Sequence, residues 1–273
     1  MYKLIAIDMD GTLLNDDKII TDKNLRMIEN AKNKGVKVVI CSGRIPGGLK
    51  FYEKTISKGQ PMICANGAII LNDKKDIIFS DSLKKDTFGK IVDTLRKDKD
   101  TYYHFYDDNI MCTEKMEFSA NKIYEFNNKI DRQYRMEIRV VPDSKEYIKR
   151  KVGLISKLVV VDEDREYLKK LRKNIQDKFE VSITKSNINN IEITSKGINK
   201  GIGLKKLANY YNIPIDQCIA IGNDENDISM IKEAGIGVVM KNARDSIKTF
   251  GNYITKNDNN NDGIAEVIEK FVL

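Results

Sequence analysis

The sequence predicts an α/β protein whose core is a doubly wound parallel sheet, with a second α+β domain inserted into it. Apolar runs alternate with amphipathic helices over the first eighty residues, and the same alternation returns near the end of the chain. This rhythm is typical of parallel strands joined by right-handed crossovers, with helices on both faces of the sheet. The middle of the chain instead alternates polar and apolar residues, which favours half-buried strands and hairpins.

The first part of the chain supplies three strands and one helix. The apolar runs typical of buried strands are residues 3–10 (KLIAIDMD), 36–44 (VKVVICSGR) and 61–70 (PMICANGAII). A helix is predicted over residues 21–35, where Thr21 is a candidate N-cap, Leu25, Ile28 and Ala31 share one face, and Gly35 ends the periodic pattern.

The remaining elements divide between the core and the insertion. In the core we expect helices over residues 197–213, 225–235 and 262–273, and strands over 216–224 and 235–240. In the insertion we expect a hairpin over 101–113, strands over 136–142 and 157–164, and a helix over 164–179. We therefore assign residues 1–82 and 190–273 to the core and residues 83–189 to the insertion. The only low-complexity stretch, NDNNND at 257–262, is interpreted as a loop.

Composition excludes several classes of protein. The net charge is +7, but the lysines are spread at helical spacing among acidic residues, which argues against nucleic-acid binding. No apolar run approaches the roughly 18 residues of a membrane span. The four cysteines are scattered and lie mostly in apolar runs, as expected of reduced thiols in a cytoplasmic protein. The single histidine, His104, argues against a zinc site or a histidine-based triad, and nothing indicates an obligate protein partner.

Polar side chains gather where predicted core strands end. They are Asp8 and Asp10 after the first strand, Ser42, Gly43 and Arg44 after the second, and Asn223, Asp224 and Asp227 after a later one, with Lys200 at the start of a helix. Ligands of open α/β sheets bind beyond the carboxyl ends of the strands. The two neighbouring aspartates could simply form a solvated loop. The whole set better suits Mg²⁺, which prefers oxygen ligands, together with a phosphoryl group.

The same residues resemble four ordered motifs of the haloacid dehalogenase (HAD) superfamily. DMDGTLL (8–14) resembles the first motif, CSGR (41–44) the second, INKG (198–201) the third and GNDENDISM (222–230) the fourth. ANGA (65–68) and the closing DGIAEVIEKFVL (262–273) further resemble the Cof-type phosphatases. The insertion lies where this superfamily carries a C2-type cap. The resemblance covers the whole chain and implies a Rossmann-like core whose cap determines substrate specificity.

The resemblance implies a role for each matched residue. Asp8 corresponds to the nucleophile, Asp10 to the general acid and base, and Lys200 to the cation that pairs with the nucleophile and the phosphate. Contacts to the substrate are implied for Ser42 and the Gly43 amide, and we add Met9, Thr12, Arg44 and Asn66 as further candidates. The alternative is structural: Thr12 orients its turn, Arg44 is a surface helix residue, and Asn66 forms a turn. The candidate Mg²⁺ ligands are Asp8, Asp10 through its carbonyl, Asn223, Asp224 and Asp227.

The fourth motif departs from the family pattern. The superfamily normally has Gly-Asp, whereas this chain has Gly222 followed by Asn223, with Asp224 one position later. The alignment favours Asn223 as the direct ligand, and a shifted loop would instead bring Asp224 to the metal. Two other polar residues receive structural interpretations: His104 as a cap-strand residue, and Asn242 as a helix cap.

The function that these residues imply is Mg²⁺-dependent hydrolysis of a small phosphomonoester, such as a sugar phosphate, a nucleotide or a cofactor phosphate. The alternative is a phosphotransferase or sugar-phosphate mutase that uses the same aspartyl nucleophile. A signalling receiver domain also has a phospho-accepting aspartate, but at the end of a middle strand and without a hundred-residue insertion. A catalytically inactive binding protein is disfavoured because every catalytic position is filled. The expected partner is a small phosphorylated metabolite.

Overall fold

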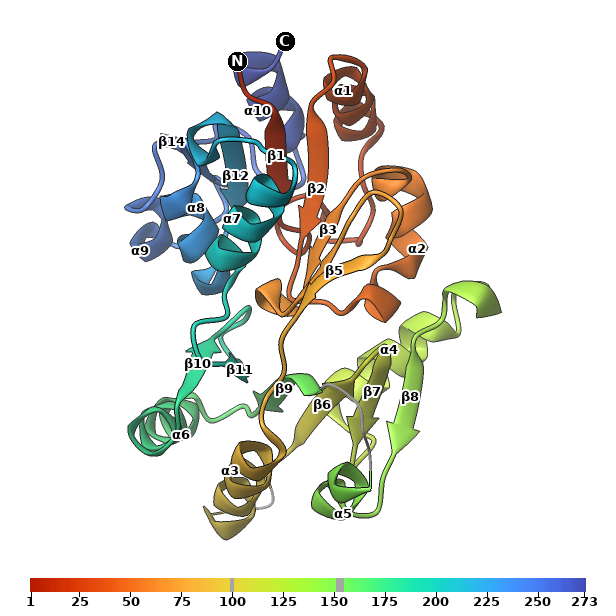
Figure 1. Ribbon diagram of the computed structural model, residues 1–273, viewed down its shortest axis with the longest axis vertical. Helices are drawn as coiled ribbons and strands as arrows, with labels where there is room; N and C mark the ends of the chain where they lie inside the picture. Colours follow the sequence, from red (N-terminus) through yellow and green to blue (C-terminus); the bar gives the residue numbers. More distant parts are fainter. Residues whose placement is uncertain (99–100, 151–154) are drawn as a thin grey trace. The chain divides into compact units, whose positions relative to one another are not determined.

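The computed structural model describes residues 1–98, 101–150 and 155–273. Their contacts divide the chain into two compact units (Figure 1). The core unit comprises Met1–Gly43, Tyr52–Phe79 and Asn199–Leu273, and the inserted unit comprises Arg44–Phe51 and Ser80–Ile198. The protein is therefore a mixed α/β structure with a parallel-sheet core, as the sequence predicts.

The core unit is built on an eight-stranded sheet in the order β14-β13-β12-β1-β2-β3-β4-β5. The strands are β1 (Leu4–Ile7), β2 (Lys37–Cys41), β3 (Met62–Cys64), β4 (Ile69–Leu71), β5 (Ile77–Ser80), β12 (Cys218–Gly222), β13 (Ile236–Val239) and β14 (Tyr253–Ile254). At the centre, β1 pairs in parallel with both β12 and β2, so that Leu4 lies opposite Cys218 and Lys37. The carboxyl ends of these three strands consequently lie at one edge of the sheet.

Helices cover this sheet (Figure 1). They are α1 (Asp22–Asn33), α2 (Lys50–Tyr52, shared with the inserted unit), α7 (Lys200–Tyr210), α8 (Ile228–Glu233), α9 (Asp245–Lys248) and α10 (Gly263–Phe271). Leu204 and Leu207 of α7 and Met230 of α8 pack in one buried cluster with Ala6 and Val39 of the strands. The predicted cap of α1 is confirmed, because the Thr21 side chain accepts a hydrogen bond from the Asn24 amide.

One predicted strand proves to be two. Residues 61–70 form β3 and β4, which pair antiparallel around a 3-10 turn at Ala65–Gly67. All three turn residues have positive φ angles: 49° for Ala65, 57° for Asn66 and 96° for Gly67. Apolar residues flank the turn on both sides, and for that reason the segment looks like one continuous strand.

The inserted unit has its own six-stranded sheet, in the order β10-β11-β9-β6-β7-β8. The strands are β6 (Tyr103–Asp107), β7 (Ile110–Thr113), β8 (Glu137–Val140), β9 (Ile155–Val161), β10 (Val181–Thr184) and β11 (Asn190–Ser195). The hairpin predicted over residues 101–113 is confirmed as the antiparallel pair β6–β7, in which Phe105 lies opposite Cys112. The pair β7–β8 is parallel.

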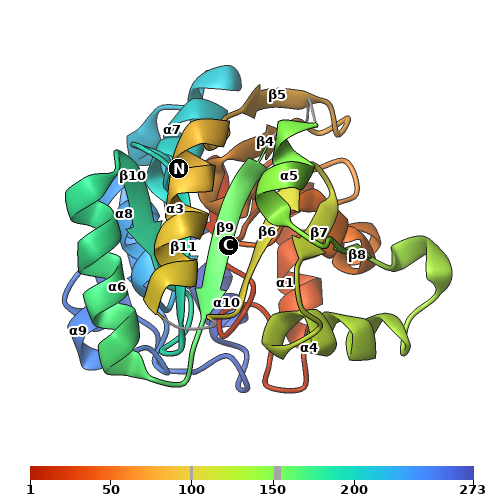
Figure 2. The ribbon, with the colours of Figure 1, turned by 90° about the horizontal axis from the view of Figure 1, so that it is seen from below.

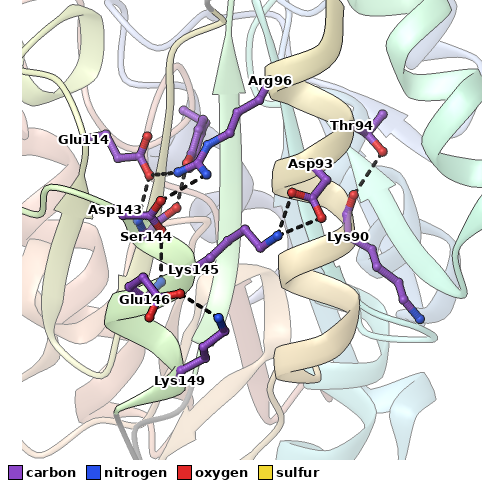
Figure 3. Close-up of polar contacts among 11 residues, drawn as sticks. Lys90, Asp93, Thr94, Arg96, Glu114, Asp143, Ser144, Lys145, Glu146 and Lys149 are labelled. Atoms are coloured by element: carbon purple, nitrogen blue, oxygen red, sulfur yellow. Dashed lines mark hydrogen bonds and ion pairs between the residues drawn. The ribbon is translucent and has the colours of Figure 1, made fainter.

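Helices α3, α5 and α6 lie on one face of this second sheet (Figure 2). The helices of the unit are α3 (Lys85–Asp98), α4 (Phe118–Asn127), α5 (Ser144–Lys149) and α6 (Arg165–Lys178). Apolar residues of α3, α5 and α6, including Phe88, Ile148 and Leu171, form one buried cluster with the strands. Ion pairs connect α3 to its neighbours, since Asp93 binds Lys145 of α5 at 2.6 Å and Arg96 binds Glu114 at 2.6 Å (Figure 3).

Two short segments outside the predicted insertion belong to the inserted unit. The first is residues 190–198, because β11 pairs with β9 and β10 of the second sheet, so the chain returns to the core unit at Asn199. The segment Arg44–Phe51 also belongs there: the Gly47 amide donates to Asn109 Oδ1 at 3.0 Å, and the Phe51 ring meets Phe126 with 5.7 Å between centroids. The assignment of this unit as a specificity cap remains a prediction.

The cysteines are buried free thiols, as the sequence predicts. They are Cys41, Cys64, Cys112 and Cys218. Along the described ranges, none of the helices combines the length and the apolar character needed to cross a membrane.

Candidate active site

The carboxyl ends of β1 and β12 carry the central residues of the candidate site. Asp8 is the first residue after β1, and Asn223 is the first residue after β12. Because the two strands are parallel neighbours, these side chains leave the sheet at the same edge. The Asp8 amide donates to the Ile221 carbonyl at 3.0 Å, which extends the strand pairing up to the nucleophile candidate.

Lys200 joins two carboxylates at this edge. Its Nζ donates to Asp8 Oδ1 and to Asp227 Oδ1, each at 2.6 Å, and the lysine side chain is fully buried. Asn199 caps α7 by accepting from the Ile202 amide, so Lys200 is fixed at the first position of the helix. Burial opposes the lysine's charge, but Asp227 and Asp8 together raise the pKa of Lys200 above its ordinary value. The lysine therefore stays a cation.

The nucleophile candidate has a strongly perturbed acidity. Burial raises the pKa of Asp8 from 3.8 to about 7, and the charge of Asp227 acts in the same direction. The ammonium of Lys200 opposes both effects, because its charge and its hydrogen bond lower the pKa of Asp8. Shifts of this size, with identified charge partners, are typical of functional sites.

Asp227 organises the loop after β12. Its Oδ2 accepts from the backbone amides of Asn223 at 2.8 Å and Asp224 at 3.0 Å, while its Oδ1 binds Lys200. The side chain is completely buried. Asp227 thus fixes both the direction of Asn223 and the position of Lys200. The sequence makes Asp227 a candidate Mg²⁺ ligand, and in the structure its carboxylate orients these two neighbours.

The Asn223 amide faces three oxygen atoms from the first loop. With its nitrogen toward them it donates to Thr12 Oγ1 at 2.9 Å, to the Asp10 carbonyl at 3.1 Å and to Asp8 Oδ2 at 3.3 Å. With its oxygen in that place it accepts from the Thr12 hydroxyl at 2.9 Å. In this second orientation the amide oxygen converges on the carboxylate and carbonyl oxygens, and a bound cation would offset the repulsion among them.

Asp224 is directed to a different partner. Its Oδ1 accepts from Arg244 at 2.5 Å and from the Glu225 amide at 2.7 Å, where it caps the short helix that precedes α8. The structure thus brings Asn223, and not the Asp224 carboxylate, to the oxygens of Asp8 and Asp10.

This donor set fits Mg²⁺. In the part of the chain that the structure describes, no group of three or more His, Cys, Asp and Glu residues suits a metal ion. The convergent oxygens instead come from one carboxylate (Asp8), one backbone carbonyl (Asp10) and one amide (Asn223). Hard cations that retain water and bind substrate phosphate are held by such small oxygen sets.

The loop after Asp8 is folded tightly on itself. The Leu13 and Leu14 amides donate to the Met9 carbonyl at 3.1 and 2.9 Å. Gly11 has a φ of +78°, and a Cβ there would approach Asn223 Nδ2 to 2.6 Å, so only glycine fits. Thr12 and Met9 are buried beneath the loop. The Asp10 side chain, 43% exposed, is directed outward and binds Lys18 Nζ at 3.0 Å.

The loop after β2 supplies the remaining candidates. Ser42 is buried, its amide donates to the Ile63 carbonyl at 2.8 Å, and its carbonyl accepts from the Asn66 amide at 3.1 Å. Asn66 in turn accepts from Asn226 Nδ2 at 3.1 Å. Gly43 ends this segment of the core unit, and Arg44 belongs to the inserted unit.

Several polar residues of the site region escaped the sequence analysis. Asn226, Asn199, Lys18 and Arg244 each bind a predicted site residue or the element that carries it. Asn226 lies within the fourth motif and could have been found there, whereas Arg244 has no comparable signal. The helix-cap interpretation of Asn242 is wrong: Arg244 precedes α9 as its cap residue, and the Asn242 amide donates to the Gly11 carbonyl at 2.8 Å.

The inserted unit carries a separate group of buried polar residues in its sheet. His104 lies in β6, where its Nε2 shares a hydrogen bond with the Tyr106 hydroxyl at 3.2 Å. Burial lowers the pKa of His104 to about 3, and the charge of Lys157 adds to this effect. Lys157 forms a buried ion pair with Glu192 at 3.2 Å. The interpretation of His104 as a strand residue is confirmed.

Comparison with known proteins gives one consistent result. The sequence profile of the haloacid dehalogenase-like hydrolases matches residues 5–268. The Bacillus subtilis protein YcsE, a 5-amino-6-(5-phospho-D-ribitylamino)uracil phosphatase, is 34% identical over 275 residues, which cover 99% of this chain and 96% of that protein.

Solved structures give the same answer. A haloacid dehalogenase-like hydrolase from B. subtilis superimposes with a TM-score of 0.88 at 25% identity, covering 99% of this chain and all of the other. One from Bacteroides thetaiotaomicron gives 0.82 at 28% identity and covers 99% of both chains. The four motifs, the parallel-sheet core and these matches show that the chain belongs to the haloacid dehalogenase-like hydrolase family and is a Cof-type phosphatase.

Proposed function

We propose that the protein is a Mg²⁺-dependent phosphatase that hydrolyses small phosphomonoesters through an aspartyl-phosphate on Asp8. The observation that carries this proposal is the buried bridge of Lys200 between Asp8 and Asp227, with Asn223 directed at the free edge of the same carboxylate. Carboxylates act as covalent nucleophiles when their charge and direction are controlled.

In the first step Asp8 attacks phosphorus, and the bond from phosphorus to the leaving oxygen breaks. Asp10 donates a proton to that oxygen. Its side chain suits this role because it is directed outward from the loop, whereas Asp8 is buried against Lys200. The two carboxyl groups therefore differ in environment, as a nucleophile and a general acid require.

In the second step Asp10 takes a proton from water, whose oxygen attacks the phosphorus of the aspartyl-phosphate. The bond from phosphorus to the Asp8 oxygen breaks, which releases inorganic phosphate and restores the carboxylate. Lys200 neutralises charge on Asp8 and on the phosphoryl group through both steps.

The Asp8 carboxylate, the Asp10 carbonyl and the Asn223 amide oxygen would hold Mg²⁺, with Asp227 orienting the loop that carries Asn223. When bound, the ion would neutralise phosphoryl charge and help to orient the substrate. Asp224 remains the alternative ligand if its pair with Arg244 opens.

The phosphoryl oxygens are assigned to the Ser42 hydroxyl and to the amides of Gly43 and Met9. Thr12 supports Asn223, as their 2.9 Å hydrogen bond indicates. Asn66 is held beside Ser42 and supports that loop. Arg44, at the start of the inserted unit, is proposed to contact the substrate outside the phosphoryl group.

Three relatives guide the choice of substrates to test. Three B. subtilis proteins that match almost the full chain, YcsE, YitU and YwtE, are 5-amino-6-(5-phospho-D-ribitylamino)uracil phosphatases. We therefore place this compound first in a panel that also contains sugar phosphates, nucleotides, pyridoxal phosphate and flavin mononucleotide.

The decisive experiment measures phosphate release across this panel with Mg²⁺ and with EDTA. Wild-type protein should release phosphate only with Mg²⁺, and Asp8→Asn should release none while unfolding at a similar temperature, because the amide has the same size but is not a nucleophile. Steady turnover by pure, folded Asp8→Asn would overturn the covalent mechanism. Adding acceptor sugars tests the alternative: a phosphotransferase would form new sugar phosphates at the expense of free phosphate.

A further inference from the structure

The asparagine-rich segment 257–262 contacts the loop that carries the catalytic aspartates. We call residues 8–16 the catalytic loop. The segment connects β14 to α10, and its own backbone is held in place: the Glu266 carboxylate accepts from the Lys256 and Asn257 amides, both at 2.9 Å. Thr255 Oγ1 donates to the Asn257 carbonyl at 2.6 Å. The segment is thus a fixed support rather than a solvated tail of polar residues.

The first contact reaches the residue next to Asp10. Asn242 Nδ2 donates to the Gly11 carbonyl at 2.8 Å, and Asn242 Oδ1 accepts from the Asn259 amide at 3.3 Å. Asn242 therefore connects the catalytic loop to the asparagine-rich segment through both ends of one amide group.

The second contact holds the far end of the same loop. Asn259, which is 4% exposed, donates from Nδ2 to the Leu14 carbonyl and to Asp16 Oδ1, each at 3.1 Å. Asn260 binds Asp16 twice, since its Nδ2 donates to Oδ2 at 3.1 Å and its Oδ1 accepts from the Asp16 amide at 3.0 Å.

We propose that Asn242 and Asn259 are positioning residues that hold Asp10 in its catalytic direction. The inference rests on the function proposed above. Gly11 directly follows Asp10, so fixing the Gly11 carbonyl fixes the orientation of the peptide that leaves Asp10. Leu14 forms a bridge pair with Asp10. The loop is thus held at Gly11, which follows Asp10, and at Leu14, which pairs with Asp10, in a stretch that contains a positive-φ glycine.

An amide is the side chain that this arrangement needs. Asn242 must donate to a carbonyl and accept from an amide at once, and Asn259 must donate to two oxygens. A carboxylate of the same size can only accept, so it would meet the Gly11 or Leu14 carbonyl as a second acceptor. Asn→Asp substitution therefore breaks the clamp without changing volume.

The test compares Asn242→Asp and Asn259→Asp with Asn261→Asp, whose side chain donates to Asp258 within the asparagine-rich segment. Two substrates are used: 4-nitrophenyl phosphate, whose leaving group needs little protonation, and ribose 5-phosphate, whose leaving group needs it strongly. We expect kcat on ribose 5-phosphate to fall about 10- to 100-fold, as for a small misplacement of a catalytic group. On 4-nitrophenyl phosphate the loss should be only a few-fold, and Asn261→Asp should match wild type.

A second arm separates positioning from general damage. In an Asp10→Asn background, Asn242→Asp should cause no further loss on ribose 5-phosphate. Asn242→Ala and Asn259→Ala, which remove the donor without adding charge, should show the same substrate-dependent loss if the aspartate variants fold poorly. Equal losses on both substrates, or full additivity with Asp10→Asn, would overturn the inference.

Hydrogen exchange gives a readout independent of turnover. Amides of residues 12–16 should exchange faster in Asn242→Asp than in wild type or Asn261→Asp. Unchanged exchange overturns the clamp even if the protein is an active phosphatase. If exchange is faster but the wild-type protein releases no phosphate, the proposed function is refuted. The inference then fails as well, because Asp10 has no role as a general acid.

Discussion

Asn223 places a neutral amide where the family motif normally carries a carboxylate. In the metal-free protein its nitrogen can donate to Asp8, Asp10 and Thr12, so the amide also satisfies these oxygens without a cation. A carboxylate at this position cannot donate and lies against Asp8.

We therefore predict that Asn223→Asp lowers the unfolding temperature without metal and tightens Mg²⁺ by roughly tenfold, or about 1.4 kcal/mol. Calorimetric titration of Mg²⁺ and thermal unfolding with and without the ion measure both effects. Asp224→Asn is the comparison, because that carboxylate is occupied by Arg244. If Asp224→Asn weakens Mg²⁺ more than Asn223→Ala does, Asp224 is the ligand.

His104 gives a pH-dependence prediction that can be assigned to one residue, because the chain has a single histidine. Its pKa falls from 6.5 to about 3 on burial in the fold. Below pH 6.5 the imidazole is therefore protonated in the unfolded chain, whereas in the folded protein it stays neutral down to about pH 3. The free energy of unfolding consequently falls as the pH drops through this window. Between pH 7 and pH 5 this contributes about 2 kcal/mol.

Urea unfolding at the two pH values should show that loss in wild type, and a loss smaller by about 2 kcal/mol in His104→Gln. The buried carboxylates titrate in both proteins, so the difference isolates the histidine. An identical pH dependence in the two proteins would show that His104 is protonated in the fold or exposed in it.

Residues at strand ends were predictable at this scale, and their distant partners were not. Asp8, Ser42 and Asn223 follow apolar runs, and the parallel pairing of β1 with β2 and β12 places all three at one edge of the sheet. Asn242 contacts Gly11 across 231 positions, and Asn259 contacts Leu14 across 245. No local pattern records contacts of that range.

At the scale of elements, the burial of a strand determined whether it could be predicted from the sequence. Buried strands such as β1, β2 and β12 were expected from their apolar runs. Strands β5 and β14 were not expected, because both are partly exposed and lack the continuous burial of the central strands. The strands β3 and β4 were merged because their turn is itself buried.

The contact between α7 and α8 gives the prediction at this scale. The Gly201 amide donates to Ser229 Oγ at 3.0 Å, and a Cβ on Gly201 would lie 2.5 Å from the Ser229 carbonyl oxygen. Gly201→Ala must therefore push the helices apart and move the adjacent Lys200. We expect a stability loss of about 1–3 kcal/mol and a fall in kcat/KM.

Gly89→Ala in α3 is the matched control. Its Cβ would meet nothing closer than 3.7 Å. Alanine there should stabilise the helix by about 0.5–1 kcal/mol, without affecting turnover. Wild-type activity and stability in Gly201→Ala would contradict the close packing of α7 on α8.

At the scale of the whole molecule, the chain consists of two compact units, and we propose that one carries the chemistry and the other the recognition of the substrate. The proposed nucleophile, lysine and metal ligands all lie in the core unit. The inserted unit has its own sheet, its own apolar cluster and the buried pair Lys157–Glu192. An inserted unit with an independent core can change its surface residues without disturbing the chemistry of the core, so we propose that it selects the leaving group.

This proposal predicts that substrate preference can be transferred with the inserted unit. Residues 44–51 and 80–198 would be replaced together by their counterparts from B. subtilis YcsE, because the shorter segment packs within this unit. The hybrid should hydrolyse 4-nitrophenyl phosphate within a few-fold of wild type, since the proposed catalytic residues are retained, and its order of preference over the metabolite panel should follow YcsE. The reverse exchange, with this inserted unit on the YcsE core, is the control and should transfer the preference order in the opposite direction. Poor folding of a hybrid would be recognised separately, because it lowers activity on every substrate in the same proportion. If both hybrids keep the preference order of their core units, selectivity resides beside the catalytic loop and the inserted unit has another role.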